Sequence, residues 1–352
     1  MTHPSSGPLA PTDPEVATEE QSADAPVVVV APLRSAGRAW SGYIAGFLAL
    51  AAVVAAVSYD EYWLSLAISA MLFAGLASAW NIIGGFGGQF SLAHSVFFGV
   101  GAYSVALLQT RQGWSPWAAL VVGAVLAAVV AALLALPLFR LRGPFFAIGT
   151  LALSEVALAL ATYFEWTGGS RGVLIPFNEQ PVSDPRIWAA LTFGFLACCV
   201  GVSLVVARGR LGYYLVAVRD DHDAASAAGA NPLVVKTIAL AISAALTGVG
   251  GGIFVMYLGF LDPPSFLSAV QVGAAIPLLA LIGGIGTVVG PVLGGLVLQP
   301  AETYLKGEMA GLHPGVSEAI VGLLLILAAL FFRGGIWGKV VWLYRKVRER
   351  RE

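Results

Sequence analysis

Few side chains in this sequence could do chemistry, and the most unusual group lies in the run Gly84–Tyr103, GGFGGQFSLAHSVFFGVGAY. Four glycines at its start would let the backbone break before a helix restarts. Behind them follow four polar side chains in apolar surroundings: Gln89, Ser91, His94 and Ser95. Irregular backbone at membrane depth is tolerated only when it is buried in protein or lines a cavity. We therefore expect this run to face the interior and to line a permeation path. The alternative is that its Ser and His side chains make hydrogen bonds between helices.

A second candidate for the path is Glu155, which lies in the middle of the apolar run Phe145–Tyr163. A carboxylate inside a membrane is expensive and usually marks a functional site or a buried pair. A proton-coupled carrier would use such a residue as a relay. A neutral or paired glutamate would only stabilise the fold.

The segment Arg208–Lys236, RGRLGYYLVAVRDDHDAASAAGANPLVVK, separates the apolar runs Ile187–Ala207 and Thr237–Gly259. Its polar stretch Tyr213–Ala228 favours a helix that would stop at Gly229, since glycine accepts the left-handed conformation at a helix end. Three of its apolar side chains are spaced to share one side of such a helix: Leu215, Val218 and Ala225. We expect a surface helix presented to a soluble partner with a groove. The alternative is a solvated helix resting on lipid headgroups, which three aspartates within four residues disfavour.

Enzyme signatures are missing from the sequence. It contains neither a GxxxxGK[ST] phosphate loop nor an HExxH zinc motif, so the chain is not expected to hydrolyse ATP itself. Its four histidines are scattered, which argues against a metal cluster. Cys198 and Cys199 are neighbours in an apolar run and are read as packing residues that do not form a disulfide with each other.

Composition indicates a membrane protein. Of 352 residues, 58% are hydrophobic and 11% are charged, and the mean hydropathy is +0.83. Apolar runs of about 20 residues span a bilayer as helices. We predict an all-α, polytopic protein with eight to ten crossings: Trp40–Ser58, Tyr62–Ile83, Gln89–Thr110, Trp117–Leu138, Phe145–Tyr163, Ile187–Ala207, Thr237–Gly259, Val272–Ile282, Thr287–Leu298 and Ser317–Phe332.

Positive charge predicts the orientation, because cytoplasmic loops are enriched in Lys and Arg. With ten crossings and the N-terminus inside, 15 of the 19 Lys and Arg residues fall on the cytoplasmic side. The remaining four are Arg111, Arg171, Arg186 and Lys306. Both termini are then cytoplasmic, as a disordered acidic tail over residues 1–33 and a basic tail over residues 334–352, with a membrane domain over residues 34–333. Residues 208–236 would be cytoplasmic. The loop Phe164–Arg186 would be external, either as a docking face or as a plain connector.

Glycine and proline patterns add three structural expectations. The sequence Ile82–Gly87 is echoed by Leu281–Gly286, a weak sign of an internal repeat. The glycines of Gly248–Gly252 and Gly286–Gly294 favour close helix packing. Asp262-Pro263-Pro264 is expected to end a helix and start a loop.

Several ordered motifs resemble one family. The stretch Ala217–Asp221, AVRDD, is followed by Ala224-Ala225, by Gly229 and Asn231, and by ISAALTGVGGGIF. Together with GGFGGQFSLAHSVFFGVGAY, RLRGPFFAIGTLALSE, TGGSRG and LIGGIGTVVGPVLGG, it resembles the membrane subunit of branched-chain amino acid ABC importers of the LivM type. The resemblance covers about Leu72–Leu298. This sequence departs from the family pattern at His222, where glutamate is usual, and at Asp223, where an apolar residue is usual.

The resemblance implies a permease in the plasma (inner) membrane that forms the translocation path for branched-chain or related amino acids. Its implied partners are a second permease subunit, identical or related, two cytoplasmic ATP-binding subunits and an external substrate-binding protein, with the bilayer around it and no nucleic acid. ATP would be used by the partners, and this chain would bind no cofactor. The implied ATPase-coupling residues are Arg219, Asp220, Asp221, Ala224, Ala225 and Gly229. Alternatives are a permease of the same family for urea or another small solute, a proton-coupled carrier using Glu155, or a passive channel.

Overall fold

The computed structural model describes residues 36–141, 143–176 and 180–308, and near the C-terminus Ala319, Gly322, Leu323, Gly335–Lys339, Val341 and Lys346. The chain divides into two units, Met1–Val30 and Ala31–Glu352, and all described residues belong to the second. The predicted acidic tail therefore lies outside the described residues. Most of the predicted last span, Ser317–Phe332, and of the basic tail lies outside them too.

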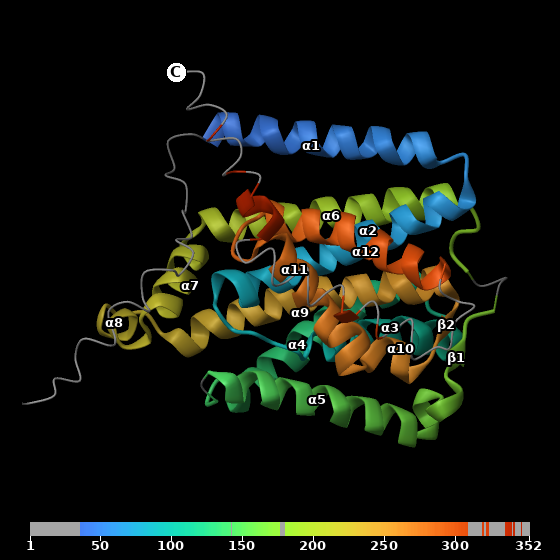
Figure 1. The fold of residues 1–352 in the computed structure, drawn as a ribbon. Helices are drawn as coiled ribbons and strands as arrows, with labels where there is room; N and C mark the ends of the chain where they lie inside the picture. Colours follow the sequence, from blue (N-terminus) through green and yellow to red (C-terminus); the bar gives the residue numbers. More distant parts are fainter. Residues whose placement is uncertain are drawn as a thin grey trace, which may run out of the picture. The chain divides into compact units, whose positions relative to one another are not determined.

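The described part is helical, as predicted. In chain order the helices are α1 (Ala36–Val57), α2 (Glu61–Asn81), α3 (His94–Gln112), α4 (Pro116–Leu138), α5 (Pro144–Tyr163), α6 (Pro185–Arg208), α7 (Arg210–Asp220), α8 (His222–Ala227), α9 (Pro232–Leu258), α10 (Pro263–Leu267), α11 (Ala275–Gly284) and α12 (Val289–Glu308). Two π-helical turns, η2 (Ile82–Phe86) and η6 (Ala269–Ala274), continue α2 and precede α11. In Figure 1, α1 and α5 lie at opposite edges of this unit, with α2, α3 and α9 between them.

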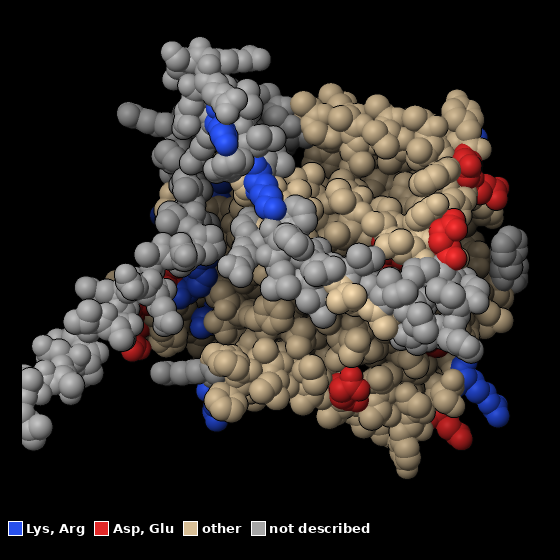
Figure 2. Space-filling view, in the orientation of Figure 1, with Lys and Arg blue, Asp and Glu red and all other residues tan. Residues whose placement is uncertain are grey.

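Six helical stretches of the described chain are long and apolar enough to cross a membrane. They are Glu61–Phe86, Pro116–Leu138, Pro144–Tyr163, Pro185–Arg208, Pro232–Leu258 and Pro263–Gly284. Figure 2 shows that most of the visible face is uncharged, with the coloured charged side chains lying mainly toward the two ends of the helices. The prediction of an all-α polytopic protein is confirmed, and eight to ten crossings stays a prediction.

Helix starts follow a simple rule of sequence. Five helices (α4, α5, α6, α9 and α10) begin with proline, whose missing N–H costs nothing in the first turn. Asp184, Asn231 and Asp262 cap α6, α9 and α10 by accepting hydrogen bonds from backbone N–H groups. The expectation that Asp262-Pro263-Pro264 ends a helix is wrong, because here an aspartate cap and a first-turn proline start one.

Small residues form the seam between α3, α4 and α9. A Cβ added at Gly101 would collide with the Gly248 carbonyl, and one at Gly251 would collide with Phe98 backbone. The buried face of α4 carries a small residue every fourth position: Ala119, Gly123, Ala127, Ala131 and Ala135. Small residues let helix backbones approach closely, which drives packing where lipid is as apolar as leucine. The predicted packing role of Gly248–Gly252 is confirmed.

The end of the molecule opposite α7 and α8 holds the predicted external loop (Figure 1). Two 3₁₀ turns lead into β1 (Val173–Leu174), which pairs antiparallel with β2 (Phe260–Leu261) in the register Val173 to Leu261 and Leu174 to Phe260. Ile175 N–H donates to the Gly259 carbonyl at 2.9 Å and extends this pairing. The loop is thus tied to the end of α9, and residues 177–179 within it lie outside the described part.

Three predicted boundaries are wrong. The third span begins at His94, not Gln89, because Gln89–Ala93 is not helical. The eighth begins at Pro263, where the Asp262 cap allows α10, η6 and α11 to follow one another. The ninth extends from Val289 to Glu308, since Pro300 is accommodated inside α12.

Candidate functional site

The glycine-rich break lies where α2 ends. The helix continues into η2, and Gly88 then adopts φ +65°, a left-handed conformation that favours glycine. A Cβ at Gly84 would collide with the Trp80 ring, and one at Gly85 with the Asn81 side chain. The glycines therefore serve the break, as the sequence predicted, and also the close packing within it, which was not predicted.

After the break the chain turns back along α2 without forming a helix. Trp80 Nε1 donates to the Ser91 carbonyl at 2.7 Å, which holds the irregular stretch beside a residue eleven positions earlier. Ser91, Ala93, His94 and Ser95 are buried, whereas Gln89 is half-buried and Phe90 is exposed. The irregular stretch is therefore buried in protein at Ser91 and Ala93 but exposed at Gly88 and Phe90.

His94 is fully buried and its protonation can be assigned from its partners. His94 Nε2 lies 2.8 Å from the Ser243 hydroxyl, which donates its hydrogen to the Ala79 carbonyl at 2.7 Å. Because the hydroxyl has only one hydrogen, His94 must donate from Nε2. His94 Nδ1 has no hydrogen-bond partner among the described residues. His94 thus joins α2, α3 and α9 at one point.

A second set of bonds joins the same stretch to α5. Ser95 donates to the Ser154 hydroxyl at 2.9 Å, and Ser154 donates to the Leu92 carbonyl at 3.1 Å. Leu92 N–H in turn donates to Thr150 Oγ1 at 3.0 Å. These contacts are the interhelical hydrogen bonds that the sequence offered as the alternative to a path lining. Whether Ser91, His94 and Ser95 also face a path stays a prediction.

Glu155 is not part of this network. Successive residues of a helix point about 100° apart, so Ser154 faces inward while Glu155 is exposed on the outer face of α5. Exposed residues along this face include Leu151, Ala152, Val156 and Ala159. The predicted path residues therefore fall into two groups, one inside the helical core and one on an outer face.

Asn81 joins the two glycine-rich echoes. Its side-chain oxygen accepts from Gly286 N–H at 2.8 Å, and its side-chain nitrogen donates to the Thr287 carbonyl at 2.9 Å. A Cβ at Gly85 would also collide with the backbone of Gly286. The two similar sequences therefore lie against each other, held by a buried amide at the base of the first break.

Arg219 of α7 reaches the same break. Its Nη1 donates to the Gly85 carbonyl at 3.2 Å, and its side-chain carbons cover Gly88, where a Cβ would collide with them. Its Nη2 bonds Asp220 Oδ1 at 3.1 Å. Leu215 also packs near Gly87. The polar segment between α6 and α9 is thus attached to the break by one guanidinium and one apolar side chain.

The polar segment forms two helices where one was predicted. Asp221 is extended and caps α8, its carboxylate accepting from Asp223 N–H and Ala224 N–H, both at 2.9 Å. A cap of this kind starts a new helix, which explains the break. The predicted apolar face is confirmed, because Leu215, Val218 and Ala225 are buried. Ala225 therefore faces into this chain, while Ala224 is exposed.

Gly229 ends α8 as predicted. Its φ is +89°, its N–H donates to the Ser226 carbonyl at 3.0 Å, and Ala230 N–H donates to the Ala225 carbonyl at 3.0 Å. This pair of bonds is the Schellman arrangement of helix ends. Asn231 then caps α9.

Sequence reasoning missed Asn81, Thr150, Ser154 and Ser243. Asn81 is a buried amide at the end of an apolar run, and such polar residues in membrane spans commonly pair between helices. Thr150 and Ser154 are four apart and therefore share one helical face. Both signals were readable, but their partners lie far away in the sequence. Among the described residues, no cluster of His, Cys, Asp or Glu is placed to hold a metal ion.

Comparisons with known proteins agree with this geometry. The family described as branched-chain amino acid transport system / permease component matches residues 62–329. The chain is 28% identical over 269 residues to the high-affinity branched-chain amino acid transport system permease protein LivM of Escherichia coli (strain K12), covering 68% of this chain and 63% of that protein. The chain thus spans less than two thirds of that relative.

Two further relatives carry similar names. The permease protein LivH of Salmonella typhimurium is 26% identical over 289 residues, covering 76% of this chain and 91% of that protein. The permease protein BraD of Pseudomonas aeruginosa is 31% identical over 140 residues, covering 40% of this chain and 43% of that protein. No solved structure matches the chain. With a family match over most of its length and several apolar helices that can span a bilayer, this multi-pass membrane protein belongs to the family of permease components of branched-chain amino acid transport systems.

Proposed function

We propose that this chain is a permease subunit of an ATP-driven importer of branched-chain or related amino acids. It works with a second permease subunit, identical or related, two cytoplasmic ATP-binding subunits and an external substrate-binding protein. ATP is bound and hydrolysed by the partners, and this chain lies in the inner membrane with both termini in the cytoplasm. Family membership supports the transport role, and the Arg219–Gly85 hydrogen bond carries the mechanical part of the proposal.

The path borders the outer face of α5. Glu155 is exposed there in the middle of a helix long enough to span the bilayer, and a carboxylate facing lipid would be expensive. Water or another protein must therefore cover this face, as they would between two permease subunits. Gln89, Ser91, His94 and Ser95 support the wall of the path from behind, through the bonds of Ser95 and Leu92 to α5.

The ATP-binding subunit docks on the exposed side of α7 and α8. Tyr213, Tyr214, Asp220, Asp221 and Ala224 are exposed, and Gly229 fixes where α8 ends. Arg219 then carries motion inward, since it is held to the Gly85 carbonyl and covers Gly88. Asn81 passes the same displacement to the second glycine-rich segment at Gly286.

The test replaces the guanidinium and keeps the hydrocarbon. Arg219→Met still covers Gly88 but loses the bond to Gly85, so we expect the assembled complex to hydrolyse ATP while uptake per ATP falls by about fivefold or more. Arg210→Met is the matched control, because Arg210 is an exposed cation at the start of the same helix. Uptake and ATP hydrolysis are measured together in reconstituted vesicles. Normal coupling in Arg219→Met would refute the relay.

Orientation is tested by labelling. After replacement of Cys198 and Cys199, a single cysteine at Gly169 should react with an impermeant reagent from outside, and one at Gly338 should not. Gly169 lies in the loop between α5 and β1, and Gly338 is exposed with no atom within 4 Å of an added Cβ. Labelling of the Gly338 position in sealed cells would show that the orientation is the opposite of the one proposed.

A proton-coupled carrier is the competing mechanism, and urea or another small solute is the competing substrate. Uptake should persist when the proton gradient is collapsed and ATP is maintained. Unlabelled leucine, isoleucine and valine should compete with uptake, and urea should not. If uptake stopped when the proton gradient was collapsed, Glu155 would be assigned as a proton relay and not only as a residue beside the path.

A further inference from the structure

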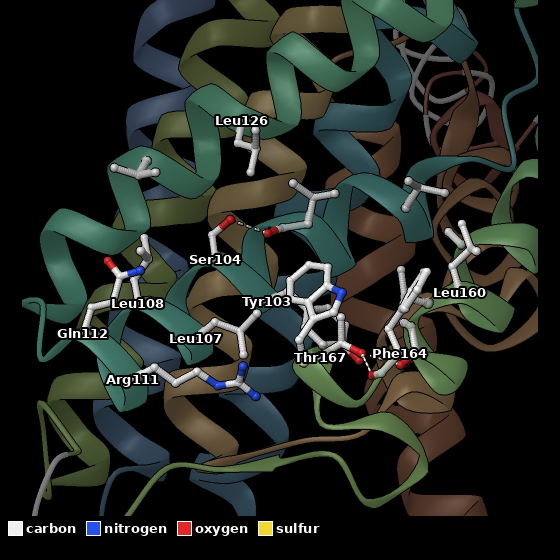
Figure 3. A pocket seen from close by; sticks show the side chains of 17 residues that line it. Tyr103, Ser104, Leu107, Leu108, Arg111, Gln112, Leu126, Leu160, Phe164 and Thr167 are labelled. Atoms are coloured by element: carbon white, nitrogen blue, oxygen red, sulfur yellow. Dashed lines mark hydrogen bonds between the residues drawn. The ribbon is translucent and has the colours of Figure 1, made fainter.

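A cavity of about 630 Å³ lies between α3, α4 and α5. Figure 3 shows Leu107 and Leu108 of α3, Leu126 of α4 and Leu160 of α5 around it. Phe164, Trp166 and Thr167 of the loop after α5 also line it. None of the hydrogen bonds around His94 or Arg219 involves it, so this cavity is separate from the site described above.

The walls are apolar and the cavity carries a single charge. Arg111, near the C-terminal end of α3, is the only charged side chain among the lining residues, and no carboxylate lines the cavity. Tyr103 also lines it, and its buried hydroxyl has no hydrogen-bond partner among the described residues. An apolar chamber with one cation at its end matches an elongated apolar molecule with an anionic head.

The cavity is open at the surface between α4 and α5. Leu126 and Leu160 are 45% and 50% exposed, and α4 and α5 are the two least buried of the six candidate spans. Phe139 stacks on Phe146 where the turn joins α4 to α5, with ring centroids 5.6 Å apart. The cavity lies in the other halves of these helices, at the end away from α7 and α8, where the two helices are not held together by such a stack.

Charge distinguishes two candidate ligands for the cavity, an amino acid and a phospholipid. An amino-acid zwitterion would bring an ammonium group as well as a carboxylate, and no acid is among the lining residues. Asp262 interacts electrostatically with Tyr103 but does not itself line the cavity. A buried charge without a partner is costly. The phosphodiester of a phospholipid needs only a cation, and its acyl chain suits the leucine and valine walls. Trp166 and Phe164 line the cavity beside the loop after α5, and aromatic side chains commonly mark the membrane–water interface.

We propose that this cavity holds one acyl chain of an anionic phospholipid, with the lipid phosphate against Arg111. In the orientation proposed above the lipid belongs to the outer leaflet, and this assignment alone rests on that orientation. The acyl chain fills the gap between α4 and α5. It supports the otherwise weakly packed α5, whose outer face carries Glu155.

The experiment measures lipid binding and needs no transport. Purified, delipidated protein receives phosphatidylglycerol with a photoactivatable group in its acyl chain, and cross-linked peptides are identified. We expect cross-links at Leu107, Leu126 or Leu160. Arg111→Gln should lower the labelling by about fivefold, the effect of one cation near a lipid phosphate. Arg111→Lys should retain most of it, and Ala157→Phe should abolish it by filling the cavity.

Matched controls decide the specificity. Arg171→Gln removes an exposed cation in the loop after α5 that does not line the cavity, and it should leave the labelling unchanged. Soluble glycerol phosphate, which has the head without the chain, should not compete. The proposal is overturned if the labelled peptides lie elsewhere, if Arg171→Gln and Arg111→Gln behave alike, or if free leucine displaces the lipid. Displacement by leucine would make the cavity a substrate site, and failure of the lipid test would leave the proposed importer role intact.

Discussion

Helix α4 meets its neighbours in two very different ways. Toward α9 and the body of α3 it presents a small residue at every fourth position, and the helices pack backbone to backbone. Toward the C-terminal half of α5 it presents Val122 and Leu126, and a cavity remains there. The same helix therefore makes a tight seam with one face and an open gap with another.

The difference follows from the bilayer as a solvent. Between helices in lipid, burying leucine gains little over leaving it in the acyl chains, so association depends on close contact and hydrogen bonds. The α4 face with alanine and glycine permits that contact, whereas the face with branched side chains keeps its neighbour at a distance. Polar bonds hold the other half of α5, through Ser154 and Thr150, and none of those bonds reaches the cavity.

The strongest test breaks the tight seam. Gly101→Leu would drive a side chain into the Gly248 carbonyl, and neither backbone can move without shifting a whole helix. We expect a loss of about 3 kcal/mol of folding stability, at the upper end for overpacking. The measurement is the yield of monodisperse protein and its thermal stability in detergent.

The control for this change is Gly194→Leu. Gly194 lies in α6 with no atom within 4 Å of an added Cβ, so the same substitution there should change stability by no more than about 0.5 kcal/mol. An equal loss of stability at both positions would mean that leucine is harmful at any glycine of these helices. Close packing between α3 and α9 would then not explain the effect at Gly101.

How far the sequence predicts this molecule depends on the range of the interaction. Apolar runs, the break at Gly84–Gly88 and the Gly229 stop follow from neighbouring residues and were predicted. The proline starts also follow from neighbouring residues, but the predicted spans did not use them. Asp221 was placed inside one continuous helix, and Asp262-Pro263-Pro264 was interpreted as a helix end. Both aspartates instead cap the start of a new helix. The pairing of Asn81 with Gly286 and of His94 with Ser243 joins residues 205 and 149 positions apart. One sequence does not indicate which distant partners meet.

A second test concerns a seam held by hydrogen bonds instead of close packing. Asn81→Leu keeps roughly the volume but leaves Gly286 N–H and the Thr287 carbonyl without the amide. The expected loss is about 1–3 kcal/mol, because buried backbone groups would be unsatisfied. Thermal unfolding in detergent measures it.

Ser78→Ala serves as the control for the amide. Ser78 is buried one turn earlier in α2, and its hydroxyl bonds only the Ala74 carbonyl of its own helix. Its loss should cost about 0.6 kcal/mol or less, the average for polar bonds in membrane helices. If Asn81→Leu were as mild, the two glycine-rich segments would not depend on the amide for their contact.

The smallest effect is expected where neither packing nor a distant partner requires glycine. An added Cβ at Gly229 meets no atom within 4 Å, so only its φ of +89° opposes a side chain. Gly229→Val should cost about 1–2 kcal/mol, the strain of a left-handed residue, and it should loosen the end of α8 while the spans stay intact. Gly229→Asn is the matched variant, because asparagine also occurs in this conformation. Hydrogen exchange should rise at Ala228–Ala230 in the valine variant alone, with weaker ATP-driven uptake. Unchanged hydrogen exchange would mean that the C-terminal end of α8 can adopt another type of turn without cost. In that case only close packing, tested at Gly101, and hydrogen bonding, tested at Asn81, would distinguish the sites, and the backbone conformation at Gly229 would not.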